Sequence, residues 1–298
     1  MVINFYEQIE ANKRRTLVII SFFVLFITLV AYVLGQASDG GSGWLLSGFL
    51  ISGVSGAGSY FWGDKFVLAV SRARPAIKKD FFEYFTVVEN LSIGAGIPMP
   101  KLYVIDDSAP NAFATGRDPQ HAVVCATTGL LSKLDRTELE GVIAHELSHI
   151  KNYDIRLMLI TTVLVGTVVL LSDWFRRAQW FRSRDRNRSQ VSSLLVIVGL
   201  LVAVLAPLVG KLVQLALSRQ REFLADASAV ALTRQPEGLA QALEKLASDR
   251  EPLEAANRAT APLYITNPLK GPDWSKKAVN LFSTHPPIEE RIRRLRQM

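Results

Sequence analysis

The pentapeptide His145-Glu146-Leu147-Ser148-His149 is the centre around which this chain is organised. On a helix, side chains four residues apart lie on one face, so both imidazoles can bind one metal ion. Glu146 follows the first imidazole directly, where its carboxylate can take a proton from a water molecule. Two imidazoles and an adjacent carboxylate are the minimal set for metal-assisted hydrolysis of a peptide bond.

The residues around the pentapeptide predict the helix that this chemistry requires. Asp135 with Glu138 three positions later has the pattern of a capping box. Apolar side chains then recur at helical spacing, at positions 139, 142, 143, 147 and 150. No proline interrupts this stretch, and Asn152 is its predicted end.

A catalytic zinc site needs three protein ligands and one open position, so two histidines are not enough. In a chain of this length the pentapeptide pattern arises by chance roughly one time in a hundred. The chain contains four histidines: His121, His145, His149 and His285. We expect His121, which precedes a β-type run, at a strand start or on the surface rather than at a metal. A third ligand is therefore sought among the carboxylates.

Glu222 and Asp226 are the candidates, in a proline-free stretch of helical composition from 212 to 232. They are four residues apart and so share one helix face. Glu222 can bind the metal while Asp226 accepts the spare N–H of a ligand histidine. A solvated, charged helix face, with Arg219 and Arg221 beside it, explains the same spacing. Spacing alone leaves both interpretations open.

Taken together, the motifs resemble the HtpX family of membrane zinc metalloproteases, relatives of the CAAX prenyl proteases. The resemblance rests on His-Glu-Leu-Ser-His at 145–149 and Arg-Glu-Phe-Leu-Ala-Asp at 221–226. Asn-Ala-Phe-Ala at 111–114 supports it, as does Thr-His-Pro-Pro at 284–287 with Arg291. Because the apolar segments also follow the family's order, the resemblance covers nearly the whole chain.

The resemblance implies a metal centre and a catalytic set. One zinc ion per subunit would be held by His145, His149 and Glu222, with Glu146 as the catalytic carboxylate. The resemblance also implies an active-site role for His285. Stabilising the oxyanion of the tetrahedral intermediate is the natural assignment for that histidine. From spacing alone, an ordinary loop histidine is the default interpretation.

Further residues are expected around this centre. Asp226 and Arg291 would lie behind the ligands, with Arg291 assisting there or pairing with Asp226. An extended peptide would lie along a sheet edge that the resemblance suggests is formed by Asn111, Ala112, Phe113 and Ala114. An ordinary strand is the alternative interpretation of that segment.

The composition is apolar for a soluble enzyme, at 49% hydrophobic residues and a mean hydropathy of +0.20. The apolar residues gather in four runs, at about 16–35, 44–62, 155–172 and 191–213. The first run is uncharged and about 30 Å long as a helix, which is enough to span a bilayer. A second run follows it closely, so we interpret the first as an uncleaved signal-anchor rather than a signal peptide.

The positions of Lys and Arg predict an orientation in the membrane. Lys13, Arg14 and Arg15 precede the first run, and basic residues follow the second, whereas 36–43 contains none. The trend for positive charge to stay inside therefore places both the N-terminus and the metal helix in the cytoplasm. The arginine-rich connection 176–188 conflicts with this trend if the third and fourth runs both cross. A hairpin that does not cross is the alternative.

Charge and cysteine content limit the class further. The net charge of +7 is explained by basic residues at membrane edges, and no nucleic-acid recognition module is visible. The single cysteine, Cys125, excludes an internal disulfide and agrees with a reducing compartment. We therefore expect a multi-pass protein of the cytoplasmic (inner) membrane with no nucleic-acid partner.

The predicted fold class is a mainly α membrane protein with a cytoplasmic zincin-like α+β domain. Short strands are expected at 101–105, 112–115 and 122–126, ahead of the metal helix. Residues 80–91 and 236–248 are expected to be helices, and the proline-containing stretch 250–283 to be irregular. The predicted parts are a transmembrane hairpin, a part with the sheet and metal helix, a second hydrophobic hairpin and a C-terminal part, at 1–71, 72–154, 155–217 and 218–298.

The expected activity is that of a zinc endopeptidase acting on polypeptides. The resemblance implies misfolded or damaged membrane proteins as substrates, in quality control under stress, with the lipid bilayer as a further partner. One alternative is a non-catalytic membrane scaffold with a structural zinc, which would not need Glu146. Another is a prenyl-protein protease.

Overall fold

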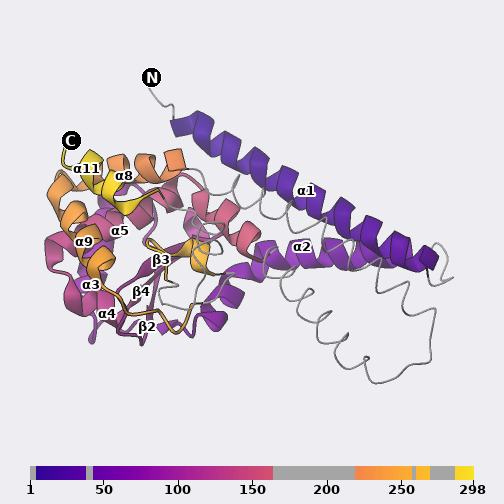
Figure 1. Ribbon diagram of the computed structural model, residues 1–298, viewed down its shortest axis with the longest axis horizontal. Helices are drawn as coiled ribbons and strands as arrows, with labels where there is room; N and C mark the ends of the chain where they lie inside the picture. The colour runs from indigo at the N-terminus through magenta and orange to yellow at the C-terminus, as the bar shows by residue number, and fades with distance from the viewer. Residues whose placement is uncertain (1–4, 38–42, 164–218, 257–259, 269–285) are drawn as a thin grey trace.

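Two long helices extend away from a domain of shorter helices and one small sheet (Figure 1). The structure, a computed structural model, describes residues 5–37, 43–163, 219–256, 260–268 and 286–298. The long helices are α1 (Phe5–Ala37) and α2 (Gly43–Val70), and they lie side by side. Their contact uses small residues, since the Ser52 hydroxyl reaches the Val24 carbonyl at 3.5 Å.

The predicted membrane spans at 16–35 and 44–62 fall within α1 and α2. Among the described residues, no helix is both long enough and apolar enough to cross a membrane. Of the two later apolar runs, only residues 155–163 are described, and they are helical. The rest of those runs, with the arginine-rich connection 176–188, lies outside the described residues. The number of membrane helices therefore stays a prediction.

The sheet has four strands in the order β1-β2-β4-β3. β1 (Arg74–Pro75) and β2 (Lys101–Ile105) are antiparallel, and so are β3 (Ala112–Gly116) and β4 (Ala122–Thr127), whereas β2 and β4 are parallel. The three strands predicted from alternation and turn residues are confirmed. β3 is the outermost strand on its side, yet every residue in it is buried.

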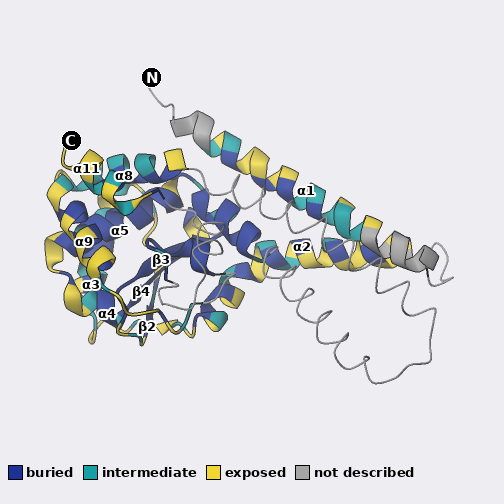
Figure 2. Ribbon diagram, in the orientation of Figure 1, coloured by how far each residue is buried: buried dark blue, intermediate teal, exposed yellow. Residues whose placement is uncertain are grey.

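Helices cover this sheet and fix the position of the metal helix α5 (Arg136–Lys151). Apolar side chains of α5, such as Val142 and Ile143, share one buried core with β3 and β4 and with α3 (Phe82–Ala95). α5 also packs against α8 (Arg219–Thr233) and α9 (Pro236–Ser248), and α11 (Ile288–Leu295) packs against these two helices (Figures 1 and 2). Two short helices, η1 (Pro119–His121) and η2 (Ala261–Leu263), and the helical turn α4 (Thr128–Lys133) complete the domain.

The start of α5 is fixed as the sequence predicted. The Asp135 carboxylate accepts from the Glu138 amide at 2.9 Å, and the Glu138 carboxylate accepts from the Asp135 amide at 2.8 Å. This reciprocal capping box satisfies two amides that a helix start leaves without partners. Lys245 of α9 also donates to Glu138 at 2.6 Å, so α9 is tied to the same end.

Close packing of α5 against α9 depends on glycine. A Cβ added at Gly141 would lie 2.7 Å from the Leu239 amide nitrogen, and one at Gly238 would lie 2.7 Å from the Thr137 carbonyl oxygen. Real Cβ atoms do not approach so closely, so each helix needs a glycine where it crosses the other. The metal helix is thus buried from residue 141 to residue 150.

Candidate metal centre

Two helices bring the predicted ligands together in the interior. α5 supplies His145 and His149, and α8 supplies Glu222, and all three are at most 5% exposed. The two Nε2 atoms lie 3.2 Å apart. Nε2 of His145 is 3.7 Å from one Glu222 carboxylate oxygen, and Nε2 of His149 is 3.6 Å from the other. In the part of the chain that the structure describes, this is the one cluster of three such residues able to hold a metal.

The arrangement fits a zinc ion. Ligand atoms about 2.0–2.1 Å from a tetrahedral zinc lie about 3.3 Å from one another, close to the separations found here. Two imidazoles and one carboxylate are also a donor set used by catalytic zinc sites, which leave the fourth position for water or substrate. The residues present therefore match the metal that the motif predicts.

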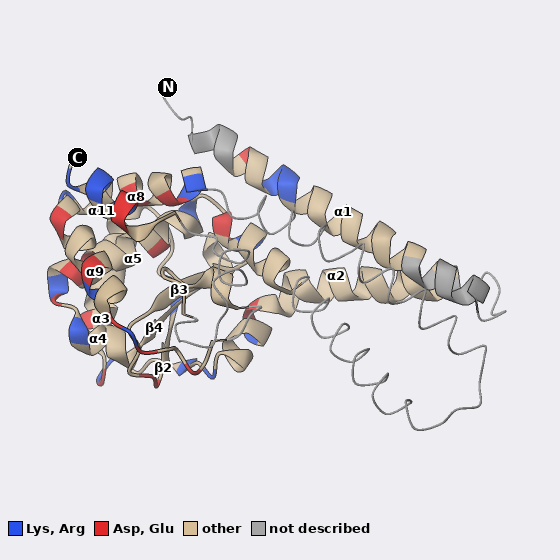
Figure 3. Cartoon of the chain, in the orientation of Figure 1, with Lys and Arg blue, Asp and Glu red and all other residues tan. Residues whose placement is uncertain are grey.

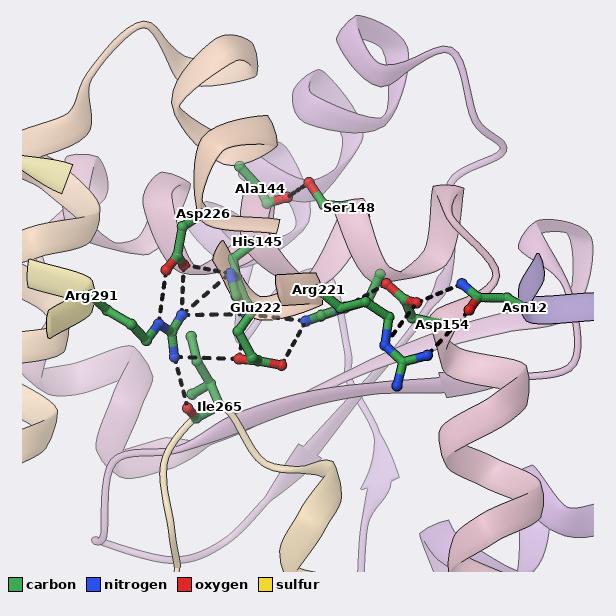
Figure 4. A network of polar contacts seen from close by, with 11 residues as sticks. Asn12, Ala144, His145, Ser148, Asp154, Arg221, Glu222, Asp226, Ile265 and Arg291 are labelled. Atoms are coloured by element: carbon green, nitrogen blue, oxygen red, sulfur yellow. Dashed lines mark hydrogen bonds and ion pairs between the residues drawn. The ribbon is translucent and has the colours of Figure 1, made fainter. Parts of the chain in front are cut away.

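Behind His145 stands a carboxylate that is itself held by an arginine. Nδ1 of His145 lies 2.9 Å from Asp226 on α8. Arg291 on α11 donates to both oxygens of Asp226, from Nε at 2.9 Å and from Nη2 at 2.7 Å (Figure 4). The same guanidinium donates to the Ile265 carbonyl at 3.3 Å and lies 3.5 Å from Glu222. Arg291 is 1% exposed, so its charge is compensated inside the protein.

Behind His149 stands a different carboxylate, Asp154, with Nδ1 at 3.1 Å. The Asn12 amide, from α1, donates to the other oxygen of Asp154 at 2.7 Å and to the Asn152 carbonyl at 3.0 Å. Arg221 of α8 donates to the Asn12 side-chain oxygen at 3.1 Å and lies 3.7 Å from Asp154 (Figure 4). Each ligand histidine therefore has its Nδ1 held by a carboxylate, which aims Nε2 at the metal position.

The surroundings shift the pKa values of the ligands in opposite directions. Burial lowers the pKa of His145 to about 4, and the charge of Arg291 acts in the same direction. Burial also acts to lower the pKa of His149, but the hydrogen bond to Asp154 and the charge of Glu222 outweigh it and raise that pKa to about 9. Burial acts to raise the pKa of Asp226, but the charge of Arg291 outweighs it, and the pKa falls to about 2. Asp226 is therefore an anion whenever the protein is folded near neutral pH.

Glu146 lies in the same interior, next to the first ligand on α5, and is 2% exposed. Its negative charge acts on both His149 and Arg291, and it raises the pKa of each. The carboxylate is thus within electrostatic reach of the ligand cluster. This is the position in which it can exchange a proton with a water molecule at the cluster.

The segment predicted to bind a peptide lies at the sheet edge. Asn111 precedes β3, and Ala112, Phe113 and Ala114 belong to it. The outward-facing carbonyl of Ala112 already accepts from the Ile265 amide at 2.9 Å. The residues on either side of Ile265 also contact this segment, since Asn111 donates to Thr266 at 3.1 Å and the Phe113 ring meets Tyr264 edge-on at 5.0 Å. Because outward positions alternate along a strand, Ala114 is the next residue whose backbone faces away from β4.

The remaining predicted residues divide into two cases. His121 ends η1, is half-exposed and lies 2.7 Å from Asp118, so it is the surface histidine that the sequence predicted. His285 lies outside the described residues, so its oxyanion role stays a prediction. Asp154, Asn12 and Arg221 were not predicted at the site.

Each missed residue had a different signal. Asp154 is only five residues after His149, but its return to the ring depends on Tyr153, whose φ of 59° turns the chain. Asn12 is 140 residues from Asn152 and left no trace in motif spacing. For Arg221 the sequence offers a solvated helix face as the alternative interpretation, and that alternative is wrong, because Arg221 is 6% exposed and Glu222 and Asp226 are buried with it.

Comparison with known proteins places the chain in a family. Residues 82–298 match peptidase family M48. The chain is 51% identical over 294 residues to a protease HtpX homologue of Dictyoglomus thermophilum, covering 99% of this chain and 95% of that one. It is 41% identical over 303 residues to a protease HtpX homologue of Thermoanaerobacter pseudethanolicus, covering 98% and 97%.

A solved structure shows the same fold. The crystal structure of Ste24p from S. mikatae matches with a TM-score of 0.52 at 19% sequence identity. The match covers 89% of this chain and 62% of that protein, so this chain is the shorter of the two. From the matched residues and the identity to its relatives, the chain belongs to peptidase family M48 and is a metallopeptidase of the HtpX type.

Proposed function

We propose that this chain is a zinc-dependent endopeptidase of the cytoplasmic membrane that hydrolyses misfolded or damaged membrane proteins at its cytoplasmic face. The observation that carries the proposal is the convergence of two Nε2 atoms and the Glu222 carboxylate, with Glu146 on the same helix as both histidines. A structural zinc would need the ligands but not that fourth side chain.

The residues divide the reaction between them. His145, His149 and Glu222 would hold the zinc ion, which when bound would supply Lewis acidity towards the scissile carbonyl and the attacking water. Glu146 takes a proton from the attacking water and delivers it to the leaving amine, so no covalent intermediate forms. His285 is the proposed donor to the oxyanion.

Positioning of the substrate is assigned to β3. An extended peptide would pair with the outward-facing backbone from Ala114 onward, since Ile265 already occupies the carbonyl of Ala112. Backbone pairing reads no side chains, and this suits an enzyme that acts on many damaged proteins. The paired stretch is therefore expected to be short and of low sequence preference.

The membrane placement is supported by the long helices. Large apolar side chains on α1 and α2 face outward, including Leu25 at 71% exposure and Val54 at 72%. A soluble protein seldom leaves so many exposed along one pair of helices. A bilayer around α1 and α2 would cover them and hold the metal centre close to substrates from the same membrane.

The test compares the wild type with Glu146→Gln, both purified in detergent with zinc. Glu146→Gln should keep one zinc per chain but cleave an unstructured protein about 10²–10⁴-fold more slowly, because the proton acceptor is lost. Glu140→Gln, on the same helix but at its surface, is the matched control and should cleave normally. His149→Ala should lose the zinc. Undiminished cleavage by Glu146→Gln would refute the proposed mechanism, and an inactive wild type with bound zinc would favour the scaffold.

A further inference from the structure

A cleft lies apart from the metal centre, where the end of α2 meets the sheet. It has a volume of about 510 Å³. Its walls come from α2, from the start of β2 and from the turn around η1. The residues that matter are Phe61, Trp62, Lys65, Lys101, Arg117 and His121.

The charge of this cleft is predominantly positive. Lys65, Lys101 and Arg117 line it against one carboxylate, Asp64. Among the described residues, neither lysine takes part in an ion pair, and both are exposed. The cleft therefore presents two exposed cations outside any ion pair of the described residues, against the single lining carboxylate of Asp64.

Arg117 differs from the lysines because its neighbours already fix it. Its guanidinium lies over the Phe61 ring, 5.4 Å from the centroid. Its Nη2 is 2.8 Å from Nε2 of His121, and its Nε is 3.5 Å from Asp118. The His121 ring is set by Asp118 in turn, at 2.7 Å from Nδ1. A guanidinium that is already fixed loses little freedom on binding an anion, and its N–H groups other than those directed at His121 and Asp118 can donate to phosphate oxygens.

The cleft stands at the border between apolar and charged surface. α2 carries no charged residue from Gly43 to Gly63, and Asp64 and Lys65 are the first. Figure 3 shows this uncharged length, and Figure 2 shows that much of it is exposed. Trp62, 60% exposed, marks the border itself. Tryptophan is enriched at the level of lipid headgroups, with apolar side chains on one side and charges on the other.

We propose that this cleft binds the phosphate headgroup of an anionic phospholipid, with the acyl chains lying along the exposed face of α2. The proposal rests on the membrane placement put forward above, but not on the protease mechanism. A headgroup brings both a phosphodiester for Lys65, Lys101 and Arg117 and hydrocarbon for the apolar face of α2. Free phosphate would satisfy only the first of these, which makes it the alternative source to be separated by experiment.

The test measures lipid affinity in neutral detergent micelles, by native mass spectrometry with increasing phosphatidylglycerol. Wild-type protein should bind phosphatidylglycerol in preference to phosphatidylcholine. Lys65→Gln with Lys101→Gln should weaken phosphatidylglycerol binding roughly 30-fold. Each basic residue near an anionic headgroup contributes about 1 kcal/mol of binding free energy, and two such contributions correspond to that change in affinity. The matched control is Arg250→Gln with Arg293→Gln, two exposed cations far from the cleft that lose the same net charge.

Each outcome decides the proposal. Selective loss in the Lys65/Lys101 variant, with the control unchanged, supports it. Equal affinities in the two double variants overturn it, as does equal binding of phosphatidylcholine. Binding of inorganic phosphate as tightly as phosphatidylglycerol would assign the cleft to free phosphate instead. Cleavage by the same samples reports separately on the protease mechanism, and sedimentation with membranes reports on the membrane placement.

Discussion

The two predicted ligand histidines lie side by side, but the residues that support them come from opposite ends of the chain. Behind His145, Asp226 is bound by two nitrogens of Arg291, at 2.9 and 2.7 Å. This side is closed by α11, close to the C-terminus, and its last member is a fully buried cation. We refer to these three residues as the arginine side.

Behind His149 the support is weaker in charge and comes from the N-terminus. Asp154 accepts a hydrogen bond from the neutral side-chain amide of Asn12 at 2.7 Å, and the guanidinium of Arg221 is 3.7 Å away. We refer to these four residues as the amide side. Through Asp154 it connects His149, a predicted metal ligand, to α1, the helix in which the first membrane span is predicted.

The difference teaches that one chemical requirement has two structural solutions. Both sides hold a carboxylate against Nδ1, as a metal-bound histidine needs. The arginine side does so with charge, so the loss of Asp226 or Arg291 leaves a buried ion without its nearest counterion. The amide side does so mainly with hydrogen bonds, so its loss should change the position of the ligand more than the stability of the fold.

The largest effect is expected from Asp226→Ala. Arg291 is 1% exposed, and removing Asp226 should cost about 3–5 kcal/mol of stability, because the buried charge loses its nearest counterion and both hydrogen bonds and keeps Glu222 at 3.5 Å. Thermal or denaturant unfolding of the zinc-free protein in detergent measures this. Asp226→Ala with Arg291→Met should recover part of the loss, since it removes both charges together.

The chain offers a matched control for burial. Asp106 accepts from Arg74 in the same two-bond geometry, at 2.7 Å each, but the pair lies on the surface. Asp106→Ala should cost less than about 1 kcal/mol, because solvent screens exposed ion pairs. Comparable losses at Asp226 and Asp106 would mean that burial does not distinguish the arginine side, and the comparison would fail.

The sequence predicted one side of this site better than the other. Asp226 lies four residues after Glu222 on one helix, so spacing offers a place beside the ligands that the resemblance favours, and Arg291 is one of its expected partners. The capping box, the strands and the metal helix were predictable for the same reason, since each depends on neighbours within a few residues.

The amide side depends on information that local patterns do not contain. Asp154 lies against His149 directly after Tyr153, which takes a left-handed conformation that bulky residues seldom adopt. Asn12 meets Asp154 across 142 residues, a contact that packing of α1 against the domain creates. A charged residue in a sequence is normally expected at the surface. The burial of Arg221 depends on the contact of α8 with α1, which local sequence patterns do not contain.

A smaller effect is expected from Asp154→Asn. The asparagine side chain has the shape of the aspartate, and its oxygen can still accept a hydrogen bond from Nδ1 of His149. It lacks the negative charge that makes the imidazole a more basic metal ligand. Zinc affinity should fall about 10–100-fold, as for other partners of metal-bound histidines. Competition against a metal chelator measures the dissociation constant, and unfolding of the zinc-free protein should change less than for Asp226→Asn. If Asp154→Asn and Asp226→Asn lower the stability of the zinc-free protein equally, the amide side depends on charge as much as the arginine side does.

The smallest effect is expected from Asn12→Ala, which tests whether α1 positions the ligand. The change leaves Asp154 and the Asn152 carbonyl without their amide donor, at a cost of about 1–3 kcal/mol for buried groups. Zinc affinity should fall by less than in Asp154→Asn, because the carboxylate still contacts His149.

Asn90→Ala, at an exposed position on α3, is the matched control and should change neither quantity. Unchanged zinc affinity in Asn12→Ala would show that α1 serves the fold alone. A loss as large as that of Asp154→Asn would show that Asp154 holds the imidazole only while α1 is in place. Since α1 contains the first predicted span, the second result would make correct insertion of that helix a condition for metal binding.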